Sequence, residues 1–172
     1  MKTFLKLVAA AFLLSLPAMA ADKEVGYPED APLITMTIPE GWMTHQQDGM
    51  FQAAASQDLD TMLVVKPLKA TKKQGSQAIA EIKEALDKTY GENIEYAKIE
   101  EGGTSNLGFY VLNAKAKLHT ADGDPTSFVN SLMVTFPDSD ELLLVQFLST
   151  EAGADKNSDA IGEIIGSIKK AE

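Results

Sequence analysis

The most strongly patterned stretch of the chain spans residues 126–150, where two long apolar runs flank a turn of Pro, Asp and Ser. Both runs are rich in Val, Phe, Leu and Thr, which is typical of β-strands. In the second run, residues 142–149, both sets of alternating side chains are mostly apolar, so this strand should be covered on both faces. The pattern therefore predicts a β-hairpin in the interior of a sheet.

Three further strands are predicted in the first half of the chain, over residues 33–38, 49–56 and 61–68. The first alternates Ile or Met with Thr, which is typical of a half-buried strand. Pro67 ends the third strand, because proline cannot donate a ladder hydrogen bond inside a sheet. Residues 22–32 are polar, contain two prolines and show no periodicity, so we expect an extended leader.

Two helices are predicted, over residues 76–90 and 157–170, because apolar side chains recur there every three or four residues. Ser76 is a candidate cap for the first helix, and Gly91 is placed to end it. Gly162 and Gly166 each weaken the second helix by about 1 kcal/mol relative to Ala. We expect these glycines to let that helix lie close to the sheet.

The segment between the helices predicts a short edge strand at residues 94–99, a loop at 102–106 and a long strand at 108–119. Asp122–Asp124 then turns the long strand into the opening hairpin. The element order is βββ-α-ββββ-α. It predicts an α+β fold, in which a mostly antiparallel sheet of about six to seven strands carries one helix on each face, an α/β/α sandwich.

The first twenty residues have the pattern of a secretory signal peptide. Lys2 and Lys6 precede an apolar run at residues 7–16, and Ala18–Ala20 is a small-x-small cleavage site. The run is too short for a helix of about 20 residues that spans a membrane. We expect a soluble periplasmic or secreted protein without a membrane anchor, with a leader at 21–32 and a single domain at 33–172.

Composition limits the classes of partner and chemistry. The chain has 15 lysines, no arginine, no cysteine and 25 acidic residues, and removal of the signal peptide changes its net charge from −10 to −12. An acidic surface disfavours nucleic acid and anionic membranes, and the lack of arginine disfavours phosphorylated ligands. Without cysteine, thiolate chemistry and cysteine-ligated metals are excluded.

Candidate catalytic and metal-binding groups are few. The acidic turns at residues 122–124 and 138–141 offer oxygen ligands but lack the spacing of a twelve-residue calcium loop, so we interpret them as turns. His45, assigned to a polar loop, and His119, at a strand end, are too few for a zinc site and are expected at the surface. Residues 103–108 match neither the GxSxG nor the GxGxxG pattern. We expect no catalytic residue, metal or cofactor.

Trp42, the only tryptophan, follows a Pro-x-Gly turn and has two interpretations. It either closes one end of the core or forms the rim of a ligand cleft. The candidate ligand or partner residues are accordingly Trp42 together with Gly103 and Asn106 of the glycine-rich loop.

The stretch from Ile34 to Trp42, ITMTIPEGW, resembles the strand and Pro-x-x-Trp start of the PsbP-like superfamily. The order of the helices resembles it too, down to the terminal segment IIGSIK, and the similarity is greatest to exported bacterial DcrB-like proteins. The resemblance spans about residues 33–170. It implies an α/β/α sandwich and a non-enzymatic binding or accessory role, with no shared catalytic residues. The chain lacks the twin-arginine signal and the lipid-attachment cysteine of some relatives.

Three functions remain, in decreasing order of preference. The first is a monomeric accessory or binding protein of the periplasm or cell envelope, whose partner is another protein or an envelope component. The second is a small-molecule carrier with a cleft near Trp42. The third is a hydrolytic enzyme, for which His45 and His119 are the remaining acid–base candidates.

If the signal interpretation is correct, the exported protein begins at Ala21. Intact-mass spectrometry of protein purified from the periplasm should give the mass of residues 21–172. An exported sample that retains Met1 would contradict the interpretation.

Overall fold

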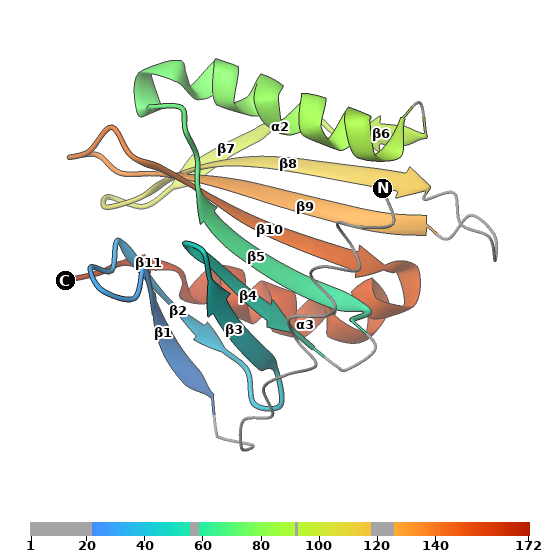
Figure 1. The fold of residues 1–172 in the computed structure, drawn as a ribbon, viewed down its shortest axis with the longest axis horizontal. Helices are drawn as coiled ribbons and strands as arrows, with labels where there is room; N and C mark the ends of the chain where they lie inside the picture. Colours follow the sequence, from blue (N-terminus) through green and yellow to red (C-terminus); the bar gives the residue numbers. More distant parts are fainter. Residues whose placement is uncertain (1–21, 56–58, 92, 118–125) are drawn as a thin grey trace.

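The computed structural model describes residues 22–55, 59–91, 93–117 and 126–172. The predicted signal peptide, His119 and the turn at residues 122–124 lie outside these ranges. Within them the chain forms two antiparallel sheets, one of eight strands and one of three, with two α-helices (Figure 1). Among the described residues, no helix is both long enough and apolar enough to cross a membrane.

The large sheet has the order β3-β4-β5-β10-β9-β8-β6, and β7 also pairs with β8. Its strands are β3 (Met43–Gln47), β4 (Met50–Ala54), β5 (Thr61–Pro67), β6 (Ile94–Tyr96), β7 (Glu100–Gly103), β8 (Gly108–Lys117), β9 (Thr126–Thr135) and β10 (Leu142–Thr150). The small sheet has the order β1-β2-β11, from β1 (Lys23–Tyr27), β2 (Ile34–Ile38) and β11 (Lys169–Lys170). The helical elements are the short 3₁₀ turn η1 (Lys72–Gln74), α2 (Gly75–Tyr90) and α3 (Glu151–Ser167).

The predicted hairpin forms the interior of the large sheet, as β9 and β10. Side chains on the two faces of β10 enter different hydrophobic clusters. Leu144 packs with Ile82 and Leu86 of α2, whereas Val145 and Phe147 pack with α3 and the small sheet. The prediction that this strand is covered on both faces is confirmed.

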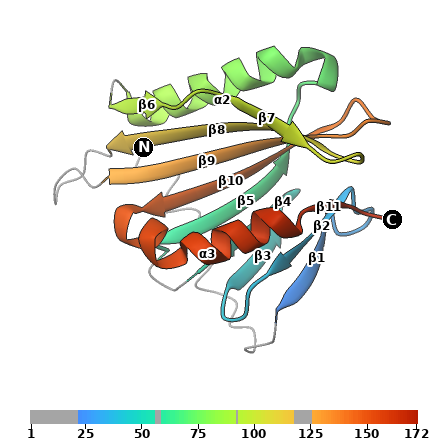
Figure 2. The ribbon, with the colours of Figure 1, turned by 180° about the vertical axis from the view of Figure 1, so that it is seen from behind.

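The fold class is also confirmed, since one helix lies on each face of a mostly antiparallel sheet (Figures 1 and 2). The cover is unequal, however. On the α3 face the small sheet completes the layer, and Tyr27, Met36 and Ile164 belong to the same buried cluster. The residues assigned to a leader are therefore partly structural, because β1 pairs along its whole length with β2.

Besides β1, three further short strands were not predicted. β3 lies where a polar loop was expected, β7 begins before the expected loop at residues 102–106, and β11 replaces the expected last turn of the terminal helix. All three lack long apolar alternation, because each lies at the edge of a sheet or pairs over only a few residues.

The two helices also begin earlier than predicted. α2 starts at Gly75 after η1 and has no side-chain cap, so Ser76 does not cap it, whereas Gly91 ends it as expected. α3 starts at Glu151, directly after β10, because the Thr150 side chain accepts a hydrogen bond from the Gly153 N–H at 3.0 Å. This cap makes a connecting loop unnecessary.

The close approach of α3 to the sheet occurs at Gly153 and not at the glycines that we expected. A Cβ atom at Gly153 would overlap the backbone carbonyl of Asp60, while Gly162 and Gly166 face open space. The proposed reason for Gly162 and Gly166 is therefore wrong.

Replacing Gly153 by Ala should lower the free energy of unfolding by about 1–3 kcal/mol, since backbone atoms must move to admit the methyl group. The matched change Gly162→Ala should raise it by about 0.5–1 kcal/mol, because alanine favours an exposed helix. Urea denaturation followed by Trp42 fluorescence measures both. Equal effects of the two substitutions would refute the assignment of the contact.

Candidate functional site

Trp42 lies in the connection between β2 and β3. Its backbone N–H donates to the Pro39 carbonyl at 3.3 Å, which closes a turn over Pro39–Trp42 with Gly41 in the third position at φ 83°. The turn is therefore one residue later than the type I turn that the Pro-x-Gly pattern predicts, and the positive φ is that of a type II turn. The indole is half-buried and packs against the main hydrophobic cluster, as the core interpretation of this residue expects.

Gly103 and Asn106 lie in the connection between β7 and β8. Gly103 is the last residue of β7 and pairs with Gly108, and a Cβ atom there would overlap the Leu107 carbonyl. The Thr104 hydroxyl accepts hydrogen bonds from the backbone N–H groups of Asn106 and Leu107, at 3.3 and 3.2 Å. These contacts explain Gly103 and Thr104 as requirements of a tight turn.

The structure does not bring these three residues together. The registers place Met43, next to Trp42, at the end of the sheet that contains Ala54 and Ser149. Gly103 pairs with Gly108 of β8, and Gly108 pairs with Thr135 of β9. Gly103 therefore lies at the other end of the sheet and at its opposite edge. The predicted site residues are therefore two separate features.

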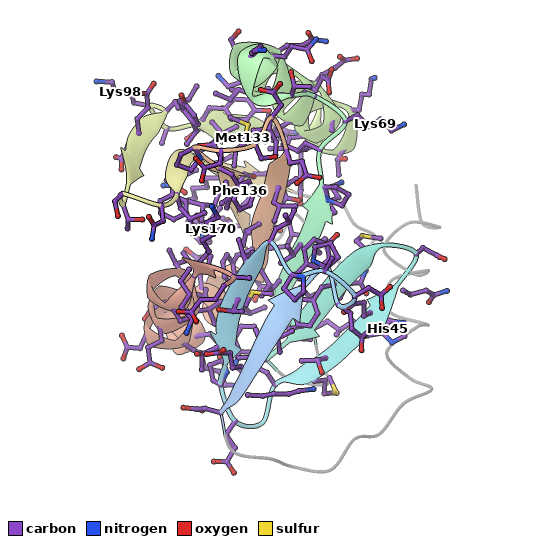
Figure 3. The ribbon with its side chains drawn as sticks, turned by 90° about the vertical axis from the view of Figure 1, so that its left-hand side faces the viewer. His45, Lys69, Lys98, Met133, Phe136 and Lys170 are labelled. Carbon is purple, nitrogen blue, oxygen red and sulfur yellow. The ribbon has the colours of Figure 1, made fainter. Side chains whose placement is uncertain are left out.

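A cleft of about 330 Å³ lies between the small sheet and the edge strand of the large sheet. Its walls combine residues from β1 and the following loop with residues from β3 and β4: Lys23, Glu24, Val25, Gly26, Glu29, Pro32, Thr44, His45, Gln46 and Phe51. Figure 3 shows His45 on β3, beside the β1–β2 hairpin. His45 thus belongs to a strand and not to a loop, and its Nε2 lies 3.1 Å from Gln47 Oε1.

The β3–β4 hairpin that forms one wall turns on Asp48 and Gly49, both with positive φ, of 52° and 70°. Two such residues form a type I′ turn, for which Asp-Gly is a strong sequence signal. This dipeptide is the signal that could have revealed β3. The flanking run MTHQQ hid the strand, because it lacks apolar alternation.

Tyr27 holds the two walls of the cleft together. Its side chain is buried, with 1% of its surface exposed, and its hydroxyl donates a hydrogen bond to the Gly49 carbonyl in the β3–β4 turn. Burial raises the pKa of the Tyr27 hydroxyl above its usual value of 10.0, so the group remains a donor at neutral pH. The contact joins β1 of the small sheet to the edge hairpin of the large one.

A second hollow lies at the end of the sheet beside the β9–β10 turn. A cleft of about 430 Å³ there is lined by Pro28, Leu33, the β5–η1 connection and residues 139–143. The acidic turn is held by ion pairs, Lys170 to Asp138 at 2.9 Å and Lys73 to Asp140 at 3.7 Å. In the part of the chain that the structure describes, no group of three His, Asp or Glu residues is arranged to hold a metal ion.

No protein-family model matches the sequence, and no curated protein matches it. Solved structures do match in fold. The PsbP protein CyanoP from Synechocystis sp. PCC 6803 has a TM-score of 0.62 at 10% identity, over 92% of this chain and 99% of that one. The Ran-binding protein Mog1p from Saccharomyces cerevisiae has a TM-score of 0.59 at 12% identity, over 89% and 96%.

LpqN, involved in cell envelope biogenesis of Mycobacterium tuberculosis, matches with a TM-score of 0.59 at 9% identity, over 88% of this chain and 91% of that one. This chain has the PsbP/Mog1 fold. The predicted resemblance to the PsbP-like superfamily is thereby confirmed at the level of fold. The closer similarity to DcrB-like proteins stays a prediction.

Tyr27→Phe should lower the free energy of unfolding by about 1–2 kcal/mol, because the Gly49 carbonyl loses its buried donor. The control Tyr110→Phe should change it by less than about 0.5 kcal/mol, since no hydrogen bond of the Tyr110 hydroxyl is among those described. Urea denaturation measures both.

The Tyr27 effect should also depend on pH. The pKa of the Tyr27 hydroxyl is raised in the folded state, whereas tyrosine in the unfolded chain ionises near pH 10. The contribution of this hydroxyl to the free energy of unfolding is therefore complete below about pH 10 and falls as the pH rises further. The difference between wild type and Tyr27→Phe should therefore shrink above about pH 10. A difference that grows with pH would contradict the buried donor.

Proposed function

We propose that this protein is an exported, non-enzymatic accessory protein of the bacterial periplasm or cell envelope, and that it acts by binding another protein. The observation that carries the proposal is the fold match over about nine-tenths of the chain to Mog1p, a Ran-binding protein, and to LpqN, involved in cell envelope biogenesis. The signal-peptide pattern of the first twenty residues supports the compartment.

The distribution of charge supports a protein partner over a nucleic acid or an anionic lipid surface. The full chain carries a net charge of −10, which repels phosphates and favours a partner with a basic surface. The ion pairs Lys73–Asp140, Lys88–Glu84 and Lys169–Glu24 are exposed, and the 25 acidic residues exceed the 15 lysines, so a net negative charge remains to act at long range.

The proposal is tested with the full chain, expressed from its own signal sequence with a C-terminal tag in a Gram-negative host. Cross-linking in intact cells and recovery from the periplasmic fraction should enrich one protein reproducibly. That protein, purified, should bind saturably, with a Kd of about 10 μM or tighter at physiological salt. The control is the same tagged chain without residues 2–20, which should stay in the cytoplasm and recover no envelope protein.

Two outcomes would contradict the proposal. One is a tagged protein that is exported correctly but recovers no saturable partner. The other is a purified protein that turns over a substrate and loses this activity on His45→Ala or His119→Ala, since the proposed role requires no acid–base residue.

A further inference from the structure

Two sheet edges face the cleft between β1 and β3. Since β2 pairs with β1 on one side and β11 on the other, β1 is an edge strand of the small sheet, and β3 is an edge strand of the large sheet. Edge strands present backbone N–H and C=O groups that can pair with another chain.

The register shows which groups of β3 are open. In the two-residue hairpin, Gln47 and Met50 form the hydrogen-bonded pair next to the turn, so hydrogen-bonded pairs alternate along the strand. The N–H and C=O groups of Thr44 and Gln46 therefore point away from β4, into the edge. In the described part of the chain, no backbone hydrogen bond reaches these outward groups.

The facing edge has the same character. The backbone N–H of Thr37 in β2 donates to Ser167 Oγ at 2.8 Å, away from β1, so the opposed residues Thr37 and Glu24, and likewise Thr35 and Gly26, are not the hydrogen-bonded pairs of this ladder. The outward residues of β1 are then Glu24 and Gly26, and both line the cleft. Open backbone groups thus face the cleft from two sides.

The opposite edge of the large sheet is protected, which makes the open edge of β3 distinctive. There, three residues between β6 and β7 oppose two of β8, which is a β-bulge, and the strands carry exposed charges at Glu95, Glu100 and Glu101. Bulges and charges are the usual protection of an edge against added strands. β3 carries no bulge, no proline, no Lys and no acidic residue.

We propose that this cleft binds an extended segment of a partner protein, which adds to the edge of β3 as a further strand. The inference rests on the proposed binding function and specifies the chemistry of the partner. The backbone of the segment pairs with the outward groups of Thr44 and Gln46. Its alternate side chains point toward Val25 and Phe51 of the cleft and toward solvent.

Size and charge select this occupant. The cleft of about 330 Å³ is at the small end of ligand pockets, which hold about 300–1,000 Å³, and its far wall is β1, so a short segment enters more readily than the sheet of a second copy. Glu24, Glu29 and Lys23 line the walls, and Glu24 is already paired with Lys169 at 3.1 Å, so the charge that bears on a partner is the net charge of the chain, −10. A segment with basic residues is therefore favoured over an acidic one.

The probe is a nine-residue peptide selected from a random displayed library against the full exported protein. Bound peptide should slow amide hydrogen exchange at Thr44 and Gln46 by at least about tenfold, and leave Glu101 on the opposite edge unchanged. The same peptide N-methylated at alternate residues keeps its side chains but loses its backbone donors, and should bind at least tenfold more weakly.

Proline substitutions supply the matched variants. Thr44→Pro and Gln46→Pro each remove one outward N–H without removing a hydrogen bond to β4. Each should weaken peptide binding at least tenfold. Glu101→Pro makes the same change at an outward position of β7 and should leave binding within about twofold. Circular dichroism and urea denaturation verify that each variant is folded.

The outcomes separate this inference from the proposed function. Strand addition is overturned if the peptide binds the β3 proline variants as tightly as it binds the wild type. It is also overturned if the N-methylated peptide binds the wild type as tightly as the unmodified peptide does, or if the wild type is a dimer that Thr44→Pro makes monomeric. A library that yields no binder also overturns it. If a periplasmic partner is captured equally by wild type and both β3 variants, the site is wrong and the proposed function stands. If peptides dock on β3 but no periplasmic partner is found, the site stands and the proposed function fails.

Discussion

The burial of the central strands on both faces is the constraint on which the rest of the structure depends. Leu142 and Leu144 on one face of β10, and Leu143, Val145 and Phe147 on the other, must all be removed from water. A two-layer arrangement would leave one of these sets exposed, at a cost of about 1.5–3 kcal/mol for each large side chain. α2 covers one set. α3 and the small sheet together cover the other, and the three layers follow.

The manner of the second covering also produces the candidate site. α3 alone is too narrow to cover the sheet from β9 to β4, so the N-terminal strands β1 and β2 fill the remaining width, with β11 on their far side. This places the edge of β1 beside the edge of β3. The hydrogen bond from Tyr27 to Gly49 joins these two edges, and the cleft lies next to it. The cleft is thus a consequence of how the core is completed.

The two edges of the large sheet have different local chemistry and, on our proposal, different roles. The β6–β7 edge combines a bulge with charges and is further secured by Tyr96, whose hydroxyl contacts the Lys83 carbonyl and Asp87 Oδ1 of α2. Burial and the neighbouring Asp87 carboxylate raise the pKa of Tyr96 well above its usual value, so this contact persists at neutral pH. The β3 edge has no such features, and a strand can therefore be added there without displacing part of the fold.

The sequence by itself determined the elements in which apolar side chains recur regularly over a long run: the β9–β10 hairpin, β8, α2 and the body of α3. With them it determined the fold class. Periodicity is informative there because each element buries a whole face. The tertiary structure alone decided where the short edge strands lie, since β3, β7 and β11 are held by backbone hydrogen bonds that leave no pattern of apolar side chains. It also separated Trp42 from Gly103 and brought Tyr27, in a stretch that looked like a leader, into the core, where its hydroxyl reaches the β3–β4 turn. Such contacts join residues that are distant in the chain, and a local pattern contains no record of them.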